Sequence, residues 1–93
     1  MNIQHRELEN SGAFYIEEGG EVLAEMVYSK PGNNQIVIEH TEVADELQGK
    51  NIGHELVERS VEYAREANIK INPVCSFAKS VFDKEPEFKD VLA

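Results

Sequence analysis

The hydrophobic period of this chain changes once, between its first forty residues and Ile52, and this change limits the possible folds more than any other feature. Apolar residues first come in short alternating runs separated by turn-forming residues, as in strands. From Ile52 to Ala67 they recur at intervals of three and four residues, which predicts an amphipathic helix. Because 93 residues suffice for one packed core, we expect a single domain over residues 1–93 in which the strands and this helix share that core.

Four strands are predicted before the long helix and one after it, followed by a short helix over Ser76–Asp83 that Ser76 can cap. The short breaks between the early strands fit antiparallel hairpins. A strand–helix–strand unit implies a right-handed crossover and one parallel strand pair. The fold class is therefore α+β, a mixed β-sheet of about five strands in the order β-β-β-β-α-β-α, covered by the long helix. The predicted strands are Ile3–Glu7, Ala13–Glu17, Val22–Ser29, Gln35–Thr41 and Ile69–Cys75.

The sequence is acidic, with 18 Asp and Glu residues, 9 Lys and Arg residues and a net charge of −9. No cluster of basic residues is available for phosphate backbones or anionic lipids, so we expect no binding to nucleic acid or to membranes. The first residues lack the apolar region of a signal peptide, and no apolar run approaches the length of a membrane span. We therefore expect a cytoplasmic protein.

Metal binding is not predicted. The single cysteine, Cys75, can form neither an intramolecular disulfide nor a multi-cysteine metal site. The three histidines, His5, His40 and His54, lack the spacing of zinc ligands on a helix.

The segment Gln48–His54 joins the fourth predicted strand to the long helix. Backbone N–H groups at the start of a helix, together with the helix dipole, form an anion site. Gly49 and Gly53 let a ligand approach the backbone, and Lys50 adds a positive charge. On spacing alone a plain structural turn is the better interpretation, because the segment matches neither the Walker A pattern nor the dinucleotide-binding glycine pattern.

The context of this segment favours the anion site. Gln48-x-x-Asn51-x-Gly53, after a strand and opening an amphipathic helix, resembles motif A of the GNAT acyl-CoA N-acyltransferases, Q/R-x-x-G-x-G/A. Asn51 stands where the first glycine of that motif is expected. Asparagine is the non-glycine residue that best tolerates a positive φ, which is the conformation that such a glycine supplies.

The resemblance extends over nearly the whole chain and is closest to a short stand-alone branch of this superfamily. That branch has a strand ending in His-Thr before the loop, here His40-Thr41, and a Cys-Ser-Phe/Tyr segment after the next strand, here Cys75-Ser76-Phe77. Its pattern near the C-terminus is matched by Phe82, Pro86, Phe88 and Val91-Leu92.

The resemblance implies a coenzyme A site, with acetyl-CoA as the co-substrate. In this family the pyrophosphate lies on the N–H groups of the loop. The pantetheine arm pairs with the end of the fourth strand, where that strand separates from the next. The residues that the resemblance assigns to this site are His40, Thr41, Glu42, Val43, Gln48, Gly49, Lys50, Asn51, Ile52, Gly53, His54, Cys75 and, as part of the groove, Phe82.

Cys75 and His40 are the candidate catalytic residues. Taken alone, Cys75 is best interpreted as a small apolar residue, although a strand end before a helix start lowers the pKa of a thiol. The resemblance implies a catalytic cysteine, either a nucleophile that accepts the acetyl group or a proton donor to the departing thiolate. His40 alternates with Ile36 and Ile38, which predicts that it faces the core, as a hydrogen-bonded core histidine or as a general base. Glu39 is the alternative base.

The function predicted in this way is an acetyl-CoA-dependent N-acetyltransferase acting on an amine of a small molecule or a protein. The alternative is a CoA-binding or interaction module without activity, because only Glu7–Gly12 is available to form an acceptor wall between the first two strands. The acidic excess lies in Glu7–Glu25 and Glu39–Glu46, outside the half assigned to the anionic co-substrate. This distribution favours a basic amine acceptor. We expect a monomer or a weak dimer.

Overall fold

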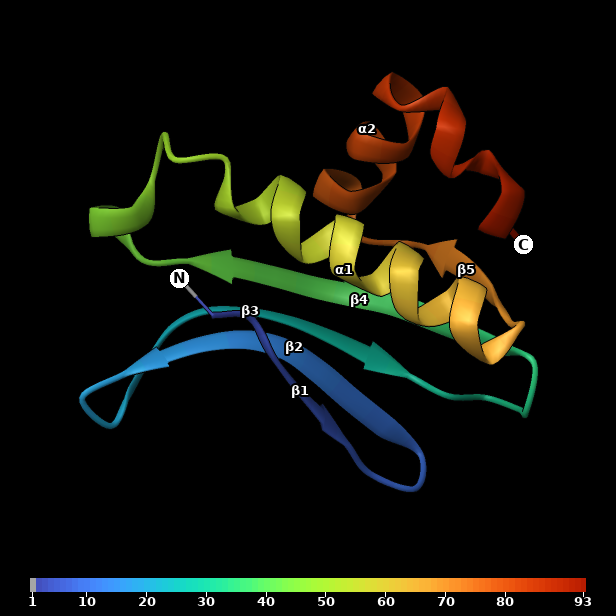
Figure 1. Cartoon of the computed structure of the whole chain (residues 1–93), viewed down its shortest axis with the longest axis horizontal. Helices are drawn as coiled ribbons and strands as arrows, with labels where there is room; N and C mark the ends of the chain where they lie inside the picture. Colours follow the sequence, from blue (N-terminus) through green and yellow to red (C-terminus); the bar gives the residue numbers. More distant parts are fainter. Residues whose placement is uncertain (1) are drawn as a thin grey trace.

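The computed structural model describes residues 2–93, which form one five-stranded sheet with its helices (Figure 1). The strands lie in the order β1-β2-β3-β4-β5, and neighbours are antiparallel except for the parallel pair β4 and β5. The predicted α+β class with its mixed sheet is confirmed. The elements are β1 (Gln4–Glu7), β2 (Ser11–Glu18), β3 (Glu21–Ser29), β4 (Gln35–Val43), the 3₁₀ helix η1 (Asp45–Leu47), α1 (Ile52–Ala67), β5 (Lys70–Pro73), α2 (Ser76–Lys84) and the 3₁₀ helix η2 (Pro86–Val91).

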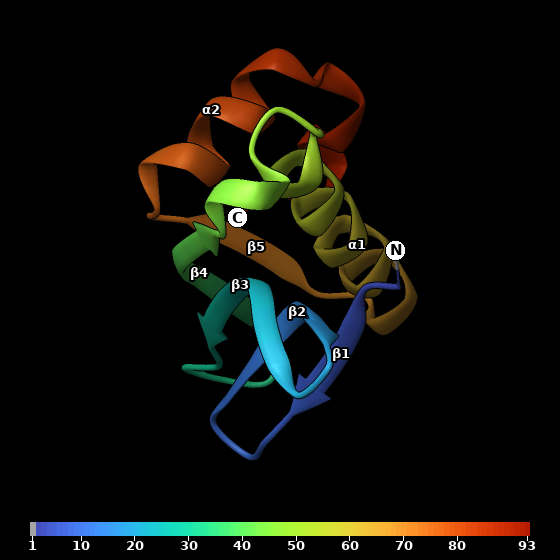
Figure 2. The same cartoon turned by 90° about the vertical axis from the view of Figure 1, so that its left-hand side faces the viewer.

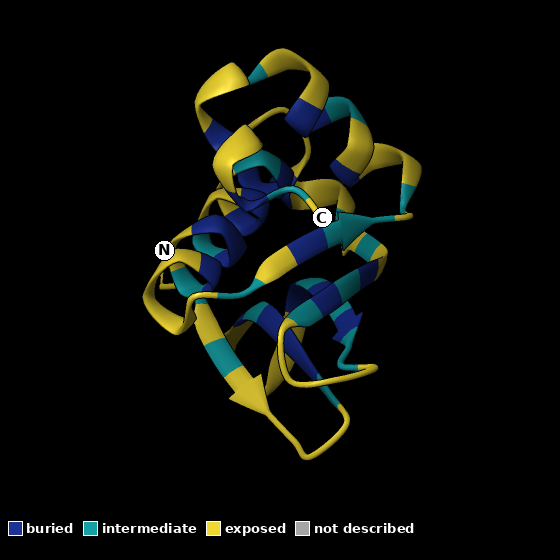
Figure 3. Cartoon of the chain, turned by 90° about the vertical axis from the view of Figure 1, so that its right-hand side faces the viewer, coloured by how far each residue is buried: buried dark blue, intermediate teal, exposed yellow. Residues whose placement is uncertain are grey.

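The core lies between the sheet and α1, because α1 and α2 both cover the same face of the sheet (Figures 1 and 2). Figure 3 shows the buried residues gathered between these two layers. The opposite face of the antiparallel strands stays largely in contact with solvent, which explains their alternating pattern. No helix within residues 2–93 is long and apolar enough to cross a membrane. The fully buried sheet residues include Phe14, Ile16, Met26, Tyr28, Ile36 and Ile38, and those of α1 include Leu56, Val57, Val61 and Ala64.

The helix α1 begins and ends where the hydrophobic period predicts, at Ile52 and Ala67. Asparagines in the left-handed conformation bound it on both sides, Asn51 with φ of 64° and Asn68 with φ of 58°. The prediction that Asn51 supplies the positive φ of a motif glycine is therefore confirmed. Asparagine adopts this conformation at lower cost than other residues with a side chain beyond Cβ.

The end of β5 and the start of α2 differ from the prediction. The strand ends at Pro73 instead of Cys75, since proline has no N–H group with which to continue the ladder. Cys75 then takes the N-cap position of α2, so the expected cap at Ser76 is wrong. The last residues of the chain return to β5, where the N–H of Ala93 donates to the carbonyl of Ile71 at 2.9 Å.

A β-bulge in β4 reverses the phase of its side chains. Tyr28 pairs with Ile38, and the residue before it in β3, Val27, pairs with His40. Glu39 is therefore an extra residue in β4 without a partner in β3. Thr41 and Val43 consequently face the helices, opposite Met26 and Ala24, while His40 and Glu42 face the open side with Val27 and Glu25. The expectation that His40 faces the core is therefore wrong, because strict alternation holds only in a strand without a bulge. The side chain of His40 is 60% exposed.

The parallel pairing of β4 with β5 covers only the first half of β4. Four residue pairs run from Gln35↔Lys70 to Ile38↔Pro73, and the N–H groups of Val74 and Cys75 then both donate to the carbonyl of Ile38. Beyond this point β4 keeps only β3 as a partner. The predicted separation of the two strands is present, and it leaves the edge of β4 from Glu39 to Val43 open on one side.

A network of polar aromatic residues anchors β1 to the core. Nε2 of His5 lies 2.6 Å from the hydroxyl of the buried Tyr28, and the His5 ring stacks on Phe14 at 4.1 Å between centroids. The hydroxyl of Tyr63 on α1 donates to Glu7 at 2.7 Å. Burial lowers the pKa of His5 below its usual value, with smaller contributions from surrounding charges.

This lowered pKa predicts a specific pH dependence of stability. Between the pKa of His5 in the folded chain and the value of about 6.5 in the unfolded chain, the unfolded state binds more protons, so stability rises with pH. We expect the melting temperature to fall as the pH is lowered from about 7.5 to about 5.5, and His5→Gln to reduce that slope. The matched control is His40→Gln, which replaces an exposed histidine. Equal slopes in the three proteins, measured by thermal denaturation, would contradict this account.

Candidate active site

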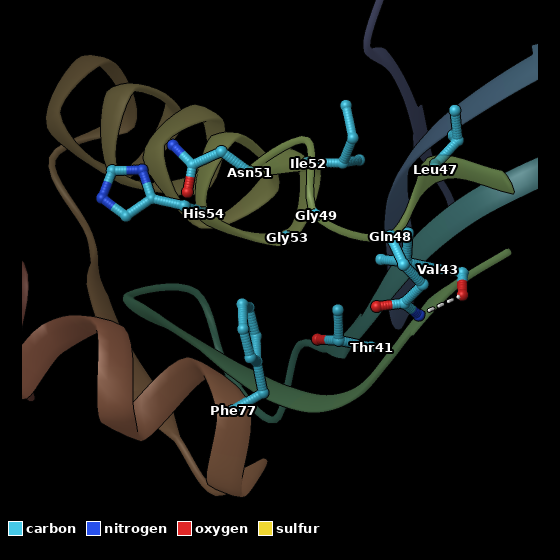
Figure 4. Close-up of a pocket in the computed structure, with 10 residues that line it drawn as sticks. All are labelled: Thr41, Val43, Leu47, Gln48, Gly49, Asn51, Ile52, Gly53, His54 and Phe77. Atoms are coloured by element: carbon cyan, nitrogen blue, oxygen red, sulfur yellow. Dashed lines mark hydrogen bonds between the residues drawn. The ribbon is translucent and has the colours of Figure 1, made fainter. Parts of the chain in front are cut away.

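A cavity of about 300 Å³ lies between the open edge of β4, the start of α1 and the first turn of α2 (Figure 4). It brings together residues from four separate elements, at the carboxyl end of the two parallel strands. Its walls combine apolar side chains with the backbone of the loop before α1. The lining residues are Thr41, Val43, Leu47, Gln48, Gly49, Asn51, Ile52, Gly53, His54 and Phe77.

The end of the cavity at α1 has the features of an anion site. Asn51 makes no side-chain hydrogen bond that would cap the helix, so the N–H groups of its first turn have no side-chain partner at the N-cap. Gly49 has φ of 78°, a left-handed conformation that favours glycine. Six of the seven residues predicted for the loop line the cavity. Lys50 is the exception, and its side chain is exposed.

The opposite end of the cavity is the unpaired edge of β4. The N–H of Ala44 donates to Leu23 on β3, so alternation along the strand turns the backbone groups of Val43 and Thr41 towards the cavity side. One of these groups is already used, because Nε2 of Gln48 donates to the carbonyl of Val43 at 2.9 Å. This bond holds the loop against the end of β4 and explains a glutamine at this position.

Cys75 lies beside the cavity and is connected to it through Thr41. Its thiol donates to the hydroxyl of Thr41, with Sγ 3.5 Å from Oγ1. Burial raises the pKa of Cys75, but the hydrogen bonds that the deprotonated sulfur accepts from the N–H of Ala78, the hydroxyl of Thr41 and the N–H groups of Phe77 and Thr41 outweigh it. The pKa of Cys75 therefore lies below its ordinary value. The start of α2 and the edge of β4 together stabilise a thiolate at this point.

His40 and Glu42 lie outside the cavity, on the open face of the sheet. Nε2 of His40 is 3.4 Å from Oε1 of Glu42, and both side chains are more than half exposed. The bulge thus separates the residues of His40–Val43 into two pairs. Thr41 and Val43 contact the cavity, and His40 and Glu42 face solvent beside it.

Phe77, and not Phe82, is the aromatic residue of the cavity. Phe82 is buried in the core and packs against Phe88 at 6.1 Å between centroids, so the expectation that it lines the groove is wrong. The two residues differ by five positions on α2, which at about 100° per residue places them on nearly opposite faces of the helix. The Cys-Ser-Phe segment contained the signal for Phe77, since a residue on the first helical turn after Cys75 must lie close to that thiol.

One contact near the anion end was not expected from the sequence. Nε2 of His54 lies 3.1 Å from Oε1 of Glu85, the residue that joins α2 to η2. This contact ties the C-terminal segment to the first turn of α1. No local pattern predicts it, because the two residues are 31 positions apart.

Comparisons with known proteins agree with this arrangement. A sequence model of the GCN5-related N-acetyl-transferase family matches residues 13–91. A solution structure from Staphylococcus aureus, described as GCN5-like, is 43% identical and covers 99% of this chain and 89% of its own, with a TM-score of 0.75. A search of the curated proteins gives no match.

More distant structures share the fold alone. Ribosomal-protein-alanine N-acetyltransferase from Brucella melitensis biovar Abortus 2308 has a TM-score of 0.63 at 15% identity, over 82% of this chain and 61% of that one. A Bacillus anthracis str. Ames protein classed as a streptothricin acetyltransferase, solved with acetyl coenzyme A, has a TM-score of 0.60 at 19% identity. That match covers 80% of this chain and 48% of the other.

The fold and the cavity thus define a small acyl-transfer domain. The chain belongs to the GCN5-related N-acetyltransferase family, so the resemblance seen in the loop and in the cysteine segment is confirmed. Its class is that of N-acetyltransferases, enzymes that use acetyl-CoA.

The hydrogen bonds around Cys75 predict its reactivity. Because they lower the pKa of the thiol, we expect alkylation by iodoacetamide to become fast at a lower pH than for a free cysteine. Thr41→Val removes the hydroxyl and should move this rate profile to higher pH. Thr41→Ser keeps the hydroxyl and is the matched control. Identical profiles for the valine variant and the unchanged protein would show that Thr41 has no influence on the thiol.

Proposed function

We propose that this chain transfers an acetyl group from acetyl-CoA to an amine, and that Cys75 takes part in the transfer. The main support for this proposal is a single cavity that joins the uncapped start of α1 to the open edge of β4. Thr41 lines this cavity and contacts Cys75 beside it. A diphosphate, an amide-bearing arm and a thioester are arranged in this order in acetyl-CoA, so the residues present fit it. When bound, acetyl-CoA supplies the activated acetyl group.

The binding half of the proposal uses backbone groups. The N–H groups of Ile52, Gly53 and His54 at the start of α1 hold the anionic end, favoured by the helix dipole. The carbonyl of Thr41 and the N–H of Val43 pair with the amides of the arm, as an added strand would. Lys50, exposed beside the loop, contributes charge at longer range.

The chemical half of the proposal assigns Cys75 as the nucleophile. The hydrogen bonds around Cys75 lower the pKa of its thiol, and a lowered pKa favours a nucleophile over a proton donor. Sγ of Cys75 forms a bond to the acetyl carbon, and the bond from that carbon to the coenzyme A sulfur breaks with its electron pair. An amine then forms a bond to the acetyl carbon, the bond to Sγ breaks, and Cys75 returns to the thiolate.

His40 is proposed as the base that takes the proton of the amine. It lies next to Thr41 in the chain but on the open face of the sheet, from which an acceptor can reach the gap between β4 and β5. Its Nε2 lies 3.4 Å from Oε1 of Glu42 on the same face.

A basic acceptor is supported by a second cavity, of about 320 Å³, at the ends of β3 and β4. Glu25 and Glu42 line it and lie directly opposite each other across the two strands. Arg6 lies 3.9 Å from Glu25 and His40 lies 3.4 Å from Glu42, and a cationic ligand adds to this neutralisation of two adjacent carboxylates. Val43 contributes to both cavities, so an amine held here is next to the acetyl site. We further propose action in the cytoplasm as a monomer or weak dimer.

The direct test is mass spectrometry of the intact protein after mixing with acetyl-CoA. We expect one acetyl adduct on the unchanged protein and none on Cys75→Ala, with acetylation of an amine acceptor reduced by about 100-fold or more in that variant. Val74→Ala, next to the cysteine, is the control. Transfer at an undiminished rate in Cys75→Ala would exclude the nucleophile and leave direct attack by the amine.

The same experiment distinguishes a non-catalytic module. Only Leu8–Asn10 separates β1 from β2, so the chain has no helical wall there to enclose an acceptor. Saturable binding of acetyl-CoA without an adduct and without turnover on any amine would favour this second function.

The charge of the acceptor can be tested with salt. If Glu25 and Glu42 attract a cationic amine, kcat/KM for a diamine should fall as salt is raised, whereas KM for acetyl-CoA should not rise in parallel. Glu42→Gln should remove part of this salt dependence, and Glu66→Gln, an exposed acid at the far end of α1, should not. Rates that are independent of salt would remove the basic acceptor from the proposal.

A further inference from the structure

Phe77 is a large apolar side chain that remains 41% exposed although it forms part of a cavity wall. It lies on the first turn of α2, two residues after Cys75, and its ring points into the cavity towards Gly53 (Figure 4). An exposed aromatic ring at a cavity gains free energy when an apolar ligand covers it. The ring therefore has the position and the chemistry of a ligand contact.

The contact between Phe77 and Gly53 explains why residue 53 is a glycine. A Cβ on Gly53 would lie 2.5 Å from Cζ of Phe77 and 2.7 Å from Cε2, closer than atoms can approach. The backbone itself does not demand glycine here, because Gly53 is a helical residue without a positive φ. Gly49 differs in this respect, since its φ of 78° does favour glycine and nothing lies within 4 Å of its missing Cβ.

The ring lies near both the anion site and the thiol of Cys75. At one end Phe77 touches Gly53, where the N–H groups of α1 form the anion site. At the other end its own helix begins at Cys75, whose thiol contacts Thr41. A ligand that connects the anion site to the thiol must pass Phe77, with Val43 also lining its route.

We propose that Phe77 is the residue that binds the pantetheine arm of the acyl donor, and that Gly53 is a glycine in order to seat this ring. The inference rests on the proposed function and deepens it, because it divides recognition of the donor into two independent parts. The start of α1 binds the nucleotide half through its phosphates. Phe77 binds the arm and so selects donors in which the acyl group is carried on pantetheine.

Two ligands distinguish binding of the nucleotide half from binding of the pantetheine arm. Coenzyme A contains both halves, and adenosine 3′,5′-bisphosphate contains only nucleotide and phosphate. We expect Phe77→Ala to weaken coenzyme A binding by about tenfold or more, since it removes a large apolar contact, and to leave bisphosphate binding within about twofold. Val74→Ala is the matched control, because Val74 is 54% exposed nearby but does not line the cavity. It should change neither affinity. Titration calorimetry gives both values.

Gly53→Ala tests the contact between residue 53 and the ring of Phe77. The clashing atoms are the far end of an exposed side chain that can turn into solvent, and alanine is the better helix former, so the melting temperature should not fall. Coenzyme A binding should weaken about as much as in Phe77→Ala, again without a change for the bisphosphate. The double variant should bind coenzyme A no more weakly than Phe77→Ala alone, because both changes remove the same contact.

Three results would overturn the inference. Equal losses for both ligands in Phe77→Ala would mean that the ring supports the whole site and not the arm. Loss of bisphosphate binding in Gly53→Ala would mean that this glycine serves the approach of the phosphates. Additive losses in the double variant would mean that the two residues act separately. If the unchanged protein binds neither ligand, the proposed function itself fails, which is a different outcome from any of these.

Discussion

The loss of the β5 partner halfway along β4 is the constraint on which the site depends. Up to Ile38 the strand is bonded on both sides, and beyond Ile38 only β3 remains. An open strand edge presents backbone groups that must find partners in water or in a ligand, and here this edge borders a cavity. The bulge at Glu39 falls at the same point and turns Thr41 and Val43 towards the helices. Two irregularities at the same point of β4 therefore create the open edge and turn the residues that line the cavity towards it.

Two helix starts meet at this gap. The helix α1 begins after the left-handed Asn51, and α2 begins after Cys75, with the ring of Phe77 against Gly53 between them. Each start provides N–H groups and partial positive charge. The first set faces the cavity where an anion fits, and the second surrounds the sulfur of Cys75. These two helix starts supply local positive charge in a strongly acidic chain, with Glu55 on the first turn of α1 and Glu85 against His54 as the nearby carboxylates.

In this small domain, the C-terminal segment covers the helices and the edge of the sheet at β5. Phe88 and Val91 of η2 are buried against the helices, and Ala93 bonds to β5. The contact between His54 and Glu85 connects this segment to the first turn of α1. The far side of the sheet has no comparable cover, and it is there that His40 and Glu42 face solvent.

The sequence by itself determined the features that depend on near neighbours in the chain. The bounds of α1 follow from its hydrophobic period, the left-handed Asn51 from the tolerance of asparagine, and the order of elements from the change of period. Only the tertiary structure decided which face of the sheet His40 occupies and which of the two phenylalanines, Phe77 or Phe82, is buried in the core. It also decided that Cys75 contacts Thr41. A bulge arises from the register between two strands, and the choice between two faces of a short helix depends on what packs against it. Both are set by residues distant in the chain, which no local period encodes.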